Sequence, residues 1–170
     1  QELLSGLEHR DRPFPLGDPV YRYTQLPARD AVTEGGIRRS NRFPNCSYFT
    51  NWTTTDDRIR WDVEVRQAGT YHVDVYYSCP EADVGSSIEL RHGESLLTGR
   101  VAAAHDPQLS GAEHDRVKRT ESYVKEFRAL RLGTMVLQQG RAPLTLRATA
   151  IPGSQVMDFR LLMFTRVEDQ

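Results

Sequence analysis

The chain has 170 residues, a length typical of one domain, and its 22 basic and 23 acidic residues leave a formal net charge of −1. This balance excludes a strongly basic nucleic-acid binder and an acidic disordered chain. No run of about 18 apolar residues is present, as a membrane-spanning helix would need, so we expect neither a nucleic-acid nor a membrane partner.

The N-terminal segment is predicted to be extended rather than helical. Prolines stand at positions 13, 15, 19 and 27, and each disfavours helical backbone at the residue before it. Helical periodicity fades after Leu7. We therefore expect an N-terminal linker and extended segment over residues 1–25 and one folded domain over residues 26–170.

Strands dominate the middle of the chain. In residues 58–65 apolar side chains alternate with charged ones, and residues 71–77 repeat this period of two, which is typical of strands with one buried face. Residues 67–70 supply a turn that joins the two runs into a hairpin. A third strand is predicted over residues 87–91, and residues 96–101 can form a further strand that pairs with it.

A long charged loop over residues 102–125 follows, and strands resume at 127–132, 134–137, 144–148 and 156–167. In the last strand Met157, Phe159, Leu161 and Met163 are predicted to share one face. Short strands with regular turns and almost no helix predict an all-β fold, an antiparallel β-sandwich of the jelly-roll type. Its predicted core consists of Ile59, Trp61, Val63, Val65, Val73, Val75, Leu144, Leu146, Phe159 and Leu161.

No motif of a catalytic centre occurs in the chain. The G-x-S-x-G, H-E-x-x-H and P-loop patterns are absent, and none of the five histidines has metal-ligand spacing. The pair Asp56-Asp57 precedes a predicted strand, where a turn or capping role is favoured over acid–base catalysis. We expect a chain that is not an enzyme and requires no cofactor.

The two cysteines, Cys46 and Cys79, are too few for a disulfide-rich scaffold. They can form one disulfide or remain two buried thiols. The spacing leaves both alternatives open.

An aromatic loop segment is the first candidate binding site. Tyr48, Asn51 and Trp52 lie in a polar stretch just before a predicted strand. An aromatic ring in such a loop can stack on the apolar face of a sugar, while Asn51 and Asp83 would bind its hydroxyl groups. The alternative is that Trp52 or Tyr48 closes the end of the sandwich core.

The charged loop holds the second candidate site, formed by Arg116, Lys118 and Arg119. Arginine and lysine suit the oxyanions of sulfate and phosphate groups, and the alternative is an ordinary solvated surface. A structural calcium ion is a third candidate. It would need oxygen ligands that converge from separate segments, for which Asp30 and Asp158 are the candidates.

Several longer segments resemble a known family. They are LPARD (26–30), SYFTNWT (47–53), TDD (55–57), Trp61, AGTY (68–71) with Val73, CPEADVGS (79–86), LTLR (144–147) and Met157-Asp158. Together they resemble the C-terminal β-sandwich domain appended to some bacterial formylglycine-dependent sulfatases. Residues 69–73, residues 83–88 and Asp158 are also similar to carbohydrate-binding modules of families 6 and 35. These modules are jelly rolls that bind glycans at loop ends or on a sheet face, often with one structural calcium ion.

The resemblance implies an accessory domain, because the sulfatase signature Cys/Ser-x-Pro-x-Arg is absent and Pro80 follows Cys79 directly. It implies a non-catalytic carbohydrate-binding module that targets a parent polysaccharide sulfatase to an anionic, sulfated polysaccharide of the algal type. The implied partners are this polysaccharide and the catalytic sulfatase domain of the same parent chain, a larger bacterial protein that is secreted or periplasmic. The alternative is a structural domain that packs on the catalytic domain and braces it without binding sugar.

Overall fold

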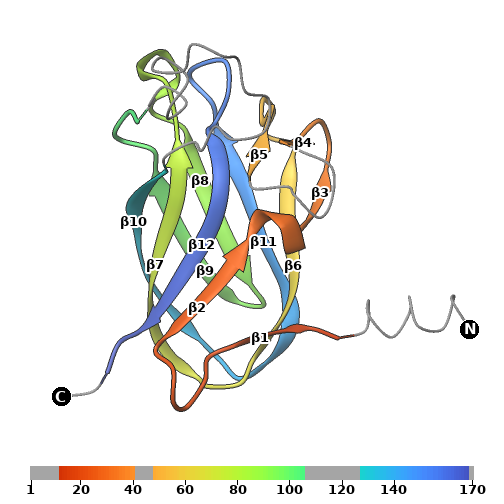
Figure 1. The fold of residues 1–170 in the computed structure, drawn as a ribbon, viewed down its shortest axis with the longest axis vertical. Coiled ribbons are helices and arrows are strands. Elements are labelled where there is room, and N and C mark those ends of the chain that lie inside the picture. Colours follow the sequence, from red (N-terminus) through yellow and green to blue (C-terminus); the bar gives the residue numbers. More distant parts are fainter. Residues whose placement is uncertain (1–11, 41–47, 106–126, 169–170) are drawn as a thin grey trace, which may run out of the picture.

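Two β-sheets face each other in the structure, a computed structural model that describes residues 12–40, 48–105 and 127–168 (Figure 1). The first sheet has the strand order β1-β6-β11-β8-β9, and β3 also pairs with β6. Its strands are β1 (Phe14–Leu16), β3 (Val32–Glu34), β6 (Arg58–Val65), β8 (Ser87–His92), β9 (Ser95–Arg100) and β11 (Gly140–Ala150).

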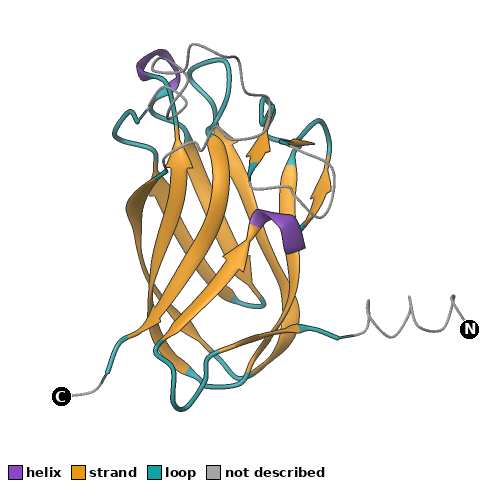
Figure 2. Ribbon diagram, viewed as in Figure 1, coloured by secondary structure: helices purple, strands orange, loops and turns teal. Residues whose placement is uncertain are grey.

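The second sheet has the strand order β10-β7-β12-β5-β4, and β2 also pairs with β12. Its strands are β2 (Tyr23–Pro27), β4 (Arg38–Arg39), β5 (Phe49–Thr50), β7 (Gly69–Ser78), β10 (Arg128–Leu137) and β12 (Asp158–Arg166). Two short 3-10 turns, η1 (Ala28–Asp30) and η2 (Glu81–Asp83), lie in the connections (Figure 2). The predicted all-β jelly-roll sandwich is therefore confirmed.

The core lies between the sheets because side chains alternate along each strand. On β6, Ile59, Trp61, Val63 and Val65 are buried, and all the other predicted core residues are buried as well. Each large apolar side chain that is fully buried stabilises the fold by about 1.5–3 kcal/mol. The intervening side chains of each strand are thereby left on the outward face of its sheet.

The alternation predicted along the last strand is broken by a bulge. The register of β12 against β7 shifts between Phe159 and Leu161, and an inserted residue of this kind moves the side chains after it to the opposite face. Leu162 and Phe164 are fully buried, whereas Met163 is only half-buried. The placement of Met163 on the buried face was wrong for this reason.

Residues 12–25, the part of the predicted linker over residues 1–25 that the structure describes, also need correction. β1 pairs in parallel with β6, with Phe14 opposite Val63, and β2 pairs antiparallel with β12, with Tyr23 opposite Thr165. The extended backbone was correctly predicted from the prolines, but it belongs to the sandwich. Pro15 is tolerated because β1 is an edge strand, where a missing amide proton leaves no ladder bond unmade.

The predicted charged loop falls largely outside the described residues, which stop at 105 and resume at 127. Cys46 lies outside them too, so its pairing with Cys79 stays untested. No helix in the described part of the chain is long and apolar enough to span a bilayer.

Candidate functional site

Trp52, predicted to stack on a sugar, is instead a core residue. Its side chain is fully buried, and its carbonyl oxygen accepts a 2.8 Å hydrogen bond from the amide of Val156. A ring with no exposed face cannot stack on a ligand, so the stacking prediction was wrong and the alternative of a core-closing ring is the correct one.

Asp83, predicted to bind sugar hydroxyls, is committed to the protein itself. Its Oδ1 accepts hydrogen bonds from the Ser154 amide at 2.8 Å and the Ser154 hydroxyl at 2.7 Å, and its Oδ2 accepts one from Gln155 Nε2 at 3.0 Å. The Ser154 hydroxyl, then the Ser154 amide and Gln155, lower the pKa of this carboxyl below its ordinary value. This buried carboxylate ties η2 to the loop before β12, so the ligand role was wrong.

Tyr48 and Asn51 stand directly before and after the short strand β5. The half-buried Tyr48 ring lies 5.4 Å from the ring of Phe127, centroid to centroid. Asn51 Nδ2 donates a 2.7 Å hydrogen bond to the Gly36 carbonyl oxygen. Unlike the buried Trp52 and Asp83, both side chains are partly exposed. Their binding of a ligand stays a prediction.

The basic group Arg116, Lys118 and Arg119 lies outside the described residues, so its role stays a prediction. Among the described residues, no group of three or more His, Cys, Asp and Glu side chains gathers in a way that could hold a metal ion. Asp30, in η1, lies 3.9 Å from the Arg29 guanidinium, and Asp158 begins β12. Calcium at these two residues is still only a prediction.

Asp57 has the turn role that was favoured for it. This buried carboxylate accepts hydrogen bonds from the amides of Gly36 at 2.9 Å and of Thr53 and Thr54, each at 3.1 Å. Burial alone would raise its pKa, but the amides of Gly36, Thr54 and Thr53 together outweigh burial and lower it. The carboxylate thus joins the turn before β6 to the loop after β3.

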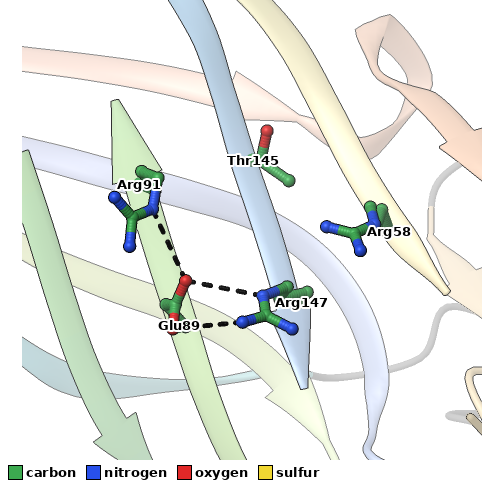
Figure 3. A pocket seen from close by; sticks show the side chains of 5 residues that line it. All are labelled: Arg58, Glu89, Arg91, Thr145 and Arg147. Carbon is green, nitrogen blue, oxygen red and sulfur yellow. Dashed lines mark hydrogen bonds and ion pairs between the residues drawn. The ribbon is translucent and has the colours of Figure 1, made fainter. Parts of the chain in front are cut away.

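The outward face of the first sheet carries a pocket that the sequence did not single out. It has a volume of 310 Å³ and is lined by Arg58, Glu89, Arg91, Thr145 and Arg147 (Figure 3). We call this group the arginine pocket. Its residues come from β6, β11 and β8, which lie side by side in the sheet.

Strand register brings these side chains together. Arg147 on β11 stands opposite both Arg58 on β6 and Glu89 on β8. Thr145, two residues earlier on β11, stands opposite Arg91 on β8. Neighbouring strands are about 4.8 Å apart, so long side chains in these rows reach one another across the sheet.

Glu89 is shared by two of the guanidiniums. Arg147 Nε and Nη2 donate to its two carboxylate oxygens at 3.4 and 3.5 Å, and Arg91 Nε lies 3.6 Å from Oε1. The Glu89 side chain is only 14% exposed. Arg58 makes no ion pair with any described residue, and its guanidinium extends from β6 toward β11 (Figure 3).

The positive charge in the pocket therefore exceeds the negative charge. Two other arginines on the same face are matched: Arg60 pairs with Glu34 at 3.1 Å, and Arg141 pairs with Asp62 at 2.7 Å. Guanidinium groups stay protonated at any ordinary pH. The pocket can thus hold and orient an anion.

Exposed apolar side chains gather at a different place, where β2 starts and β12 ends. Val20, Tyr21 and Tyr23 are 76%, 70% and 61% exposed. The chain around them lies against the end of β12, since the Arg166 amide donates to the Arg22 carbonyl oxygen at 2.9 Å. We call this group the tyrosine end. It lies at the start of β2, in the second sheet, whereas the arginine pocket lies on the first sheet.

No family model matches the chain, and no curated protein matches it in sequence. Its fold is similar to that of several solved structures. One is the CBM36-1 domain of a multidomain xylanase from the hindgut metagenome of Trinervitermes trinervoides, with a TM-score of 0.53 and 12% identity over 86% of this chain and 99% of that one. This carbohydrate-binding module is matched over nearly its whole length.

Two longer chains contain a similar sandwich. The Podospora anserina GH26-CBM35 β-(1,4)-mannanase has a TM-score of 0.55 and 12% identity, over 87% of this chain and 28% of that one. The mosquito-larvicidal Cry4Aa toxin from Bacillus thuringiensis has a TM-score of 0.59 and 13% identity, over 86% and 24%. This chain thus spans about a quarter of either protein.

At these identities the similarity shows the fold alone, which is the sandwich found in carbohydrate-binding modules. The expected carbohydrate-binding-module fold is confirmed, while the link to sulfatases stays a prediction. Because a toxin shares the same sandwich, the function has to be argued from the residues on its surface.

Proposed function

We propose that this chain is a non-catalytic carbohydrate-binding domain whose ligand is an anionic polysaccharide. The observation that carries the proposal is the excess of positive charge on the outward face of the first sheet, where Arg58, Arg91 and Arg147 line one pocket with a single carboxylate, Glu89, which pairs with Arg91 and Arg147 only. An open sheet face of this kind can receive a long chain, and its arginines can pair with negative groups along it.

A sulfated polysaccharide of the algal galactan or fucan type is the finer part of the proposal. It is supported by the resemblance to sulfatase-associated sandwich domains and by the preference of arginine for sulfate oxyanions. The domain would act in a secreted or periplasmic bacterial sulfatase. There it would keep the catalytic domain at its polymeric substrate by raising the local concentration.

The affinity of one such domain for one polysaccharide segment is expected to be modest. Exposed hydroxyl groups contribute little net free energy once their bound water is displaced. Charge pairing on an open face is also weakened by salt, because the Debye length is about 8 Å at physiological ionic strength. Targeting would then depend on repeated contacts along a polymer.

A second candidate function is a structural one, in which the domain braces a neighbouring catalytic domain. The tyrosine end favours it, since Val20, Tyr21 and Tyr23 expose large apolar surfaces close to one another in the chain. Exposed apolar patches often mark contacts between proteins or domains. Both functions can coexist, because the tyrosine end and the arginine pocket are on different sheets.

Native affinity electrophoresis tests the proposal with a matched pair of galactans. The chain is run through gels that contain carrageenan, which is sulfated, or agarose, which is neutral, at low and at physiological salt. We expect retardation by carrageenan only, and less of it at the higher salt concentration. Equal mobility in both gels at low salt would contradict polysaccharide binding through charge and leave the structural role as the better account.

A further inference from the structure

We propose that the arginine pocket is a subsite for one sulfate ester group of a sugar residue, bound by Arg58, Thr145 and Arg147. This inference rests on the proposed function and assigns the contact that would carry it. In this pocket three guanidiniums lie beside one hydroxyl group.

Arg58 supplies the charge that is available to the ligand. Its side chain is half-buried, which limits the number of positions that the guanidinium samples. It has no ion-pair partner among the described residues, whereas Arg60, the next outward residue on β6, is matched by Glu34. An incoming anion therefore gains a new pair at Arg58 without displacing an ion pair to any described residue.

Arg147 and Thr145 complete the donor set from the neighbouring strand. Arg147 uses Nε and Nη2 for Glu89, and a guanidinium has further N–H groups on its other edge. Thr145, in the next row of β11, stands between Arg60 on β6 and Arg91 on β8 and lines the same pocket as Arg58, and its hydroxyl can donate one hydrogen bond (Figure 3). The three donors thus come from two neighbouring strands: Arg58 and Arg147 stand opposite each other, and Thr145 lies two residues before Arg147 on β11.

This arrangement fits a sulfate ester better than a carboxylate. A sulfate ester presents three terminal oxygens in different directions, which matches three separate donor groups. A carboxylate presents two oxygens in one plane, and a single guanidinium already satisfies it in a bidentate pair. The volume of 310 Å³ lies at the small end of the range of roughly 300–1000 Å³ for ligand pockets, so one substituted sugar residue fills it.

Glu89 acts as a positioning residue. Arg91 and Arg147 would repel each other on adjacent strands, and the shared carboxylate holds both guanidiniums in place. Glu89 also lowers the net charge of the pocket, so two opposite effects on anion binding are combined in one side chain. If orientation dominates, Glu89→Gln weakens binding even though it adds one unit of net positive charge.

Calorimetric titration of the full chain with carrageenan oligosaccharides tests the subsite. We expect Arg58→Gln to weaken binding roughly tenfold or more, since a charge-assisted contact is lost. Thr145→Val, which keeps the shape and the charge, is expected to weaken it about fivefold. Arg60→Gln is the matched control, because it removes the same charge from the same strand outside the pocket; its effect should be about twofold or less.

The outcomes separate the two proposals. If the wild-type chain binds no carrageenan oligosaccharide, the proposed function fails. If the wild type binds and Arg58→Gln behaves like Arg60→Gln, the subsite assignment fails and the function stands. Tighter binding of alginate oligosaccharides, whose only anions are carboxylates, would overturn the sulfate assignment, and stronger binding by Glu89→Gln would overturn its positioning role.

Folding of each variant is checked by its melting temperature. If Arg58→Gln unfolds the chain, Arg58→Lys replaces it in the titration, since it keeps the charge and loses the planar guanidinium. Weaker binding by Arg58→Lys at an unchanged melting temperature supports the subsite. Binding equal to that of the wild type overturns a specific role for the Arg58 guanidinium.

Discussion

Asp83 and Ser154 are joined by two hydrogen bonds to a single oxygen: the Ser154 amide and hydroxyl both donate to Asp83 Oδ1, at 2.8 and 2.7 Å. The relationship explains why the loop before β12 lies against η2. It also explains why Asp83 is no ligand for sugar hydroxyls, since its oxygens are already occupied. Two segments that are far apart in sequence are held together by one buried carboxylate.

Asp83→Asn is therefore expected to lower the free energy of unfolding by about 2 kcal/mol. The substituted amide keeps the shape of the side chain, but one oxygen becomes an N–H donor that faces the donors of Ser154 or Gln155. Urea denaturation measures the loss. An unchanged midpoint would contradict the role assigned to this carboxylate, and unchanged carrageenan binding by the folded variant is expected.

The stability of the fold should depend on pH through Asp57 and Asp83. The pKa of each is lowered in the folded state below the ordinary value of 3.8. A carboxyl of this kind contributes stability that is fully present above the pKa of the unfolded chain and is lost as pH falls through the folded pKa. We expect the free energy of unfolding to fall between about pH 5 and pH 2.

Urea denaturation at a series of pH values checks this expectation. The double variant Asp57→Asn/Asp83→Asn should be less stable at neutral pH and should show a flatter dependence on pH across the acid range. If the wild type and the double variant lose stability in parallel on acidification, other groups are responsible for the acid sensitivity.

Trp52→Ala should reduce stability and leave ligand binding unaffected in the fraction that is folded. The ring is fully buried, and truncation of a buried aromatic residue costs about 3–5 kcal/mol. Thermal unfolding measures the loss, with Tyr48→Ala at the loop surface as the comparison. A Trp52→Ala chain that melts like the wild type but loses carrageenan binding would restore the stacking role.

Gly35 is expected to tolerate no side chain. Its φ of +91° is in the left-handed region, and a Cβ there would overlap Asp57 Oδ1. Gly35→Ala would thus add backbone strain and displace the carboxylate, at about 2–4 kcal/mol in total. Gly93→Ala is the matched control, because φ is +57° there and no atom lies within 4 Å of the added Cβ.

The Gly93→Ala control measures the cost of a positive φ without a steric contact of the added Cβ. Gly93→Ala is expected to cost about 1–2 kcal/mol from positive φ alone. Chemical denaturation of both variants gives the comparison, and equal losses would show that Asp57 does not depend on the space beside Gly35.

The sheets and their core could be predicted from sequence because their signal is local. The alternation from Ile59 to Val65 specifies a strand and its buried face without any knowledge of its neighbours. The bulge in β12 escaped prediction, since it is defined by the register against β7 and leaves no mark in the composition of the strand.

The candidate site was harder to predict because it depends on strand order. Arg58, Glu89 and Arg147 are unremarkable outward residues of three separate strands, and they meet only because β11 inserts between β6 and β8. The basic cluster that is contiguous in the chain, Arg116, Lys118 and Arg119, gives a stronger signal in the sequence than arginines on separate strands. The signal that could have helped was the spacing of arginines at outward positions, read together with a correct strand order.

The central claim, that a sulfated polysaccharide binds on the outward face of the first sheet, is tested most directly by nuclear magnetic resonance. Backbone amide and arginine Nε–Hε signals are followed while carrageenan oligosaccharides are added to the chain. We predict shifts confined to β6, β8 and β11 and largest at Arg58, Thr145 and Arg147, with no response to agarose oligosaccharides. Shifts centred on Tyr21 and Tyr23, or none at all, would contradict the claim.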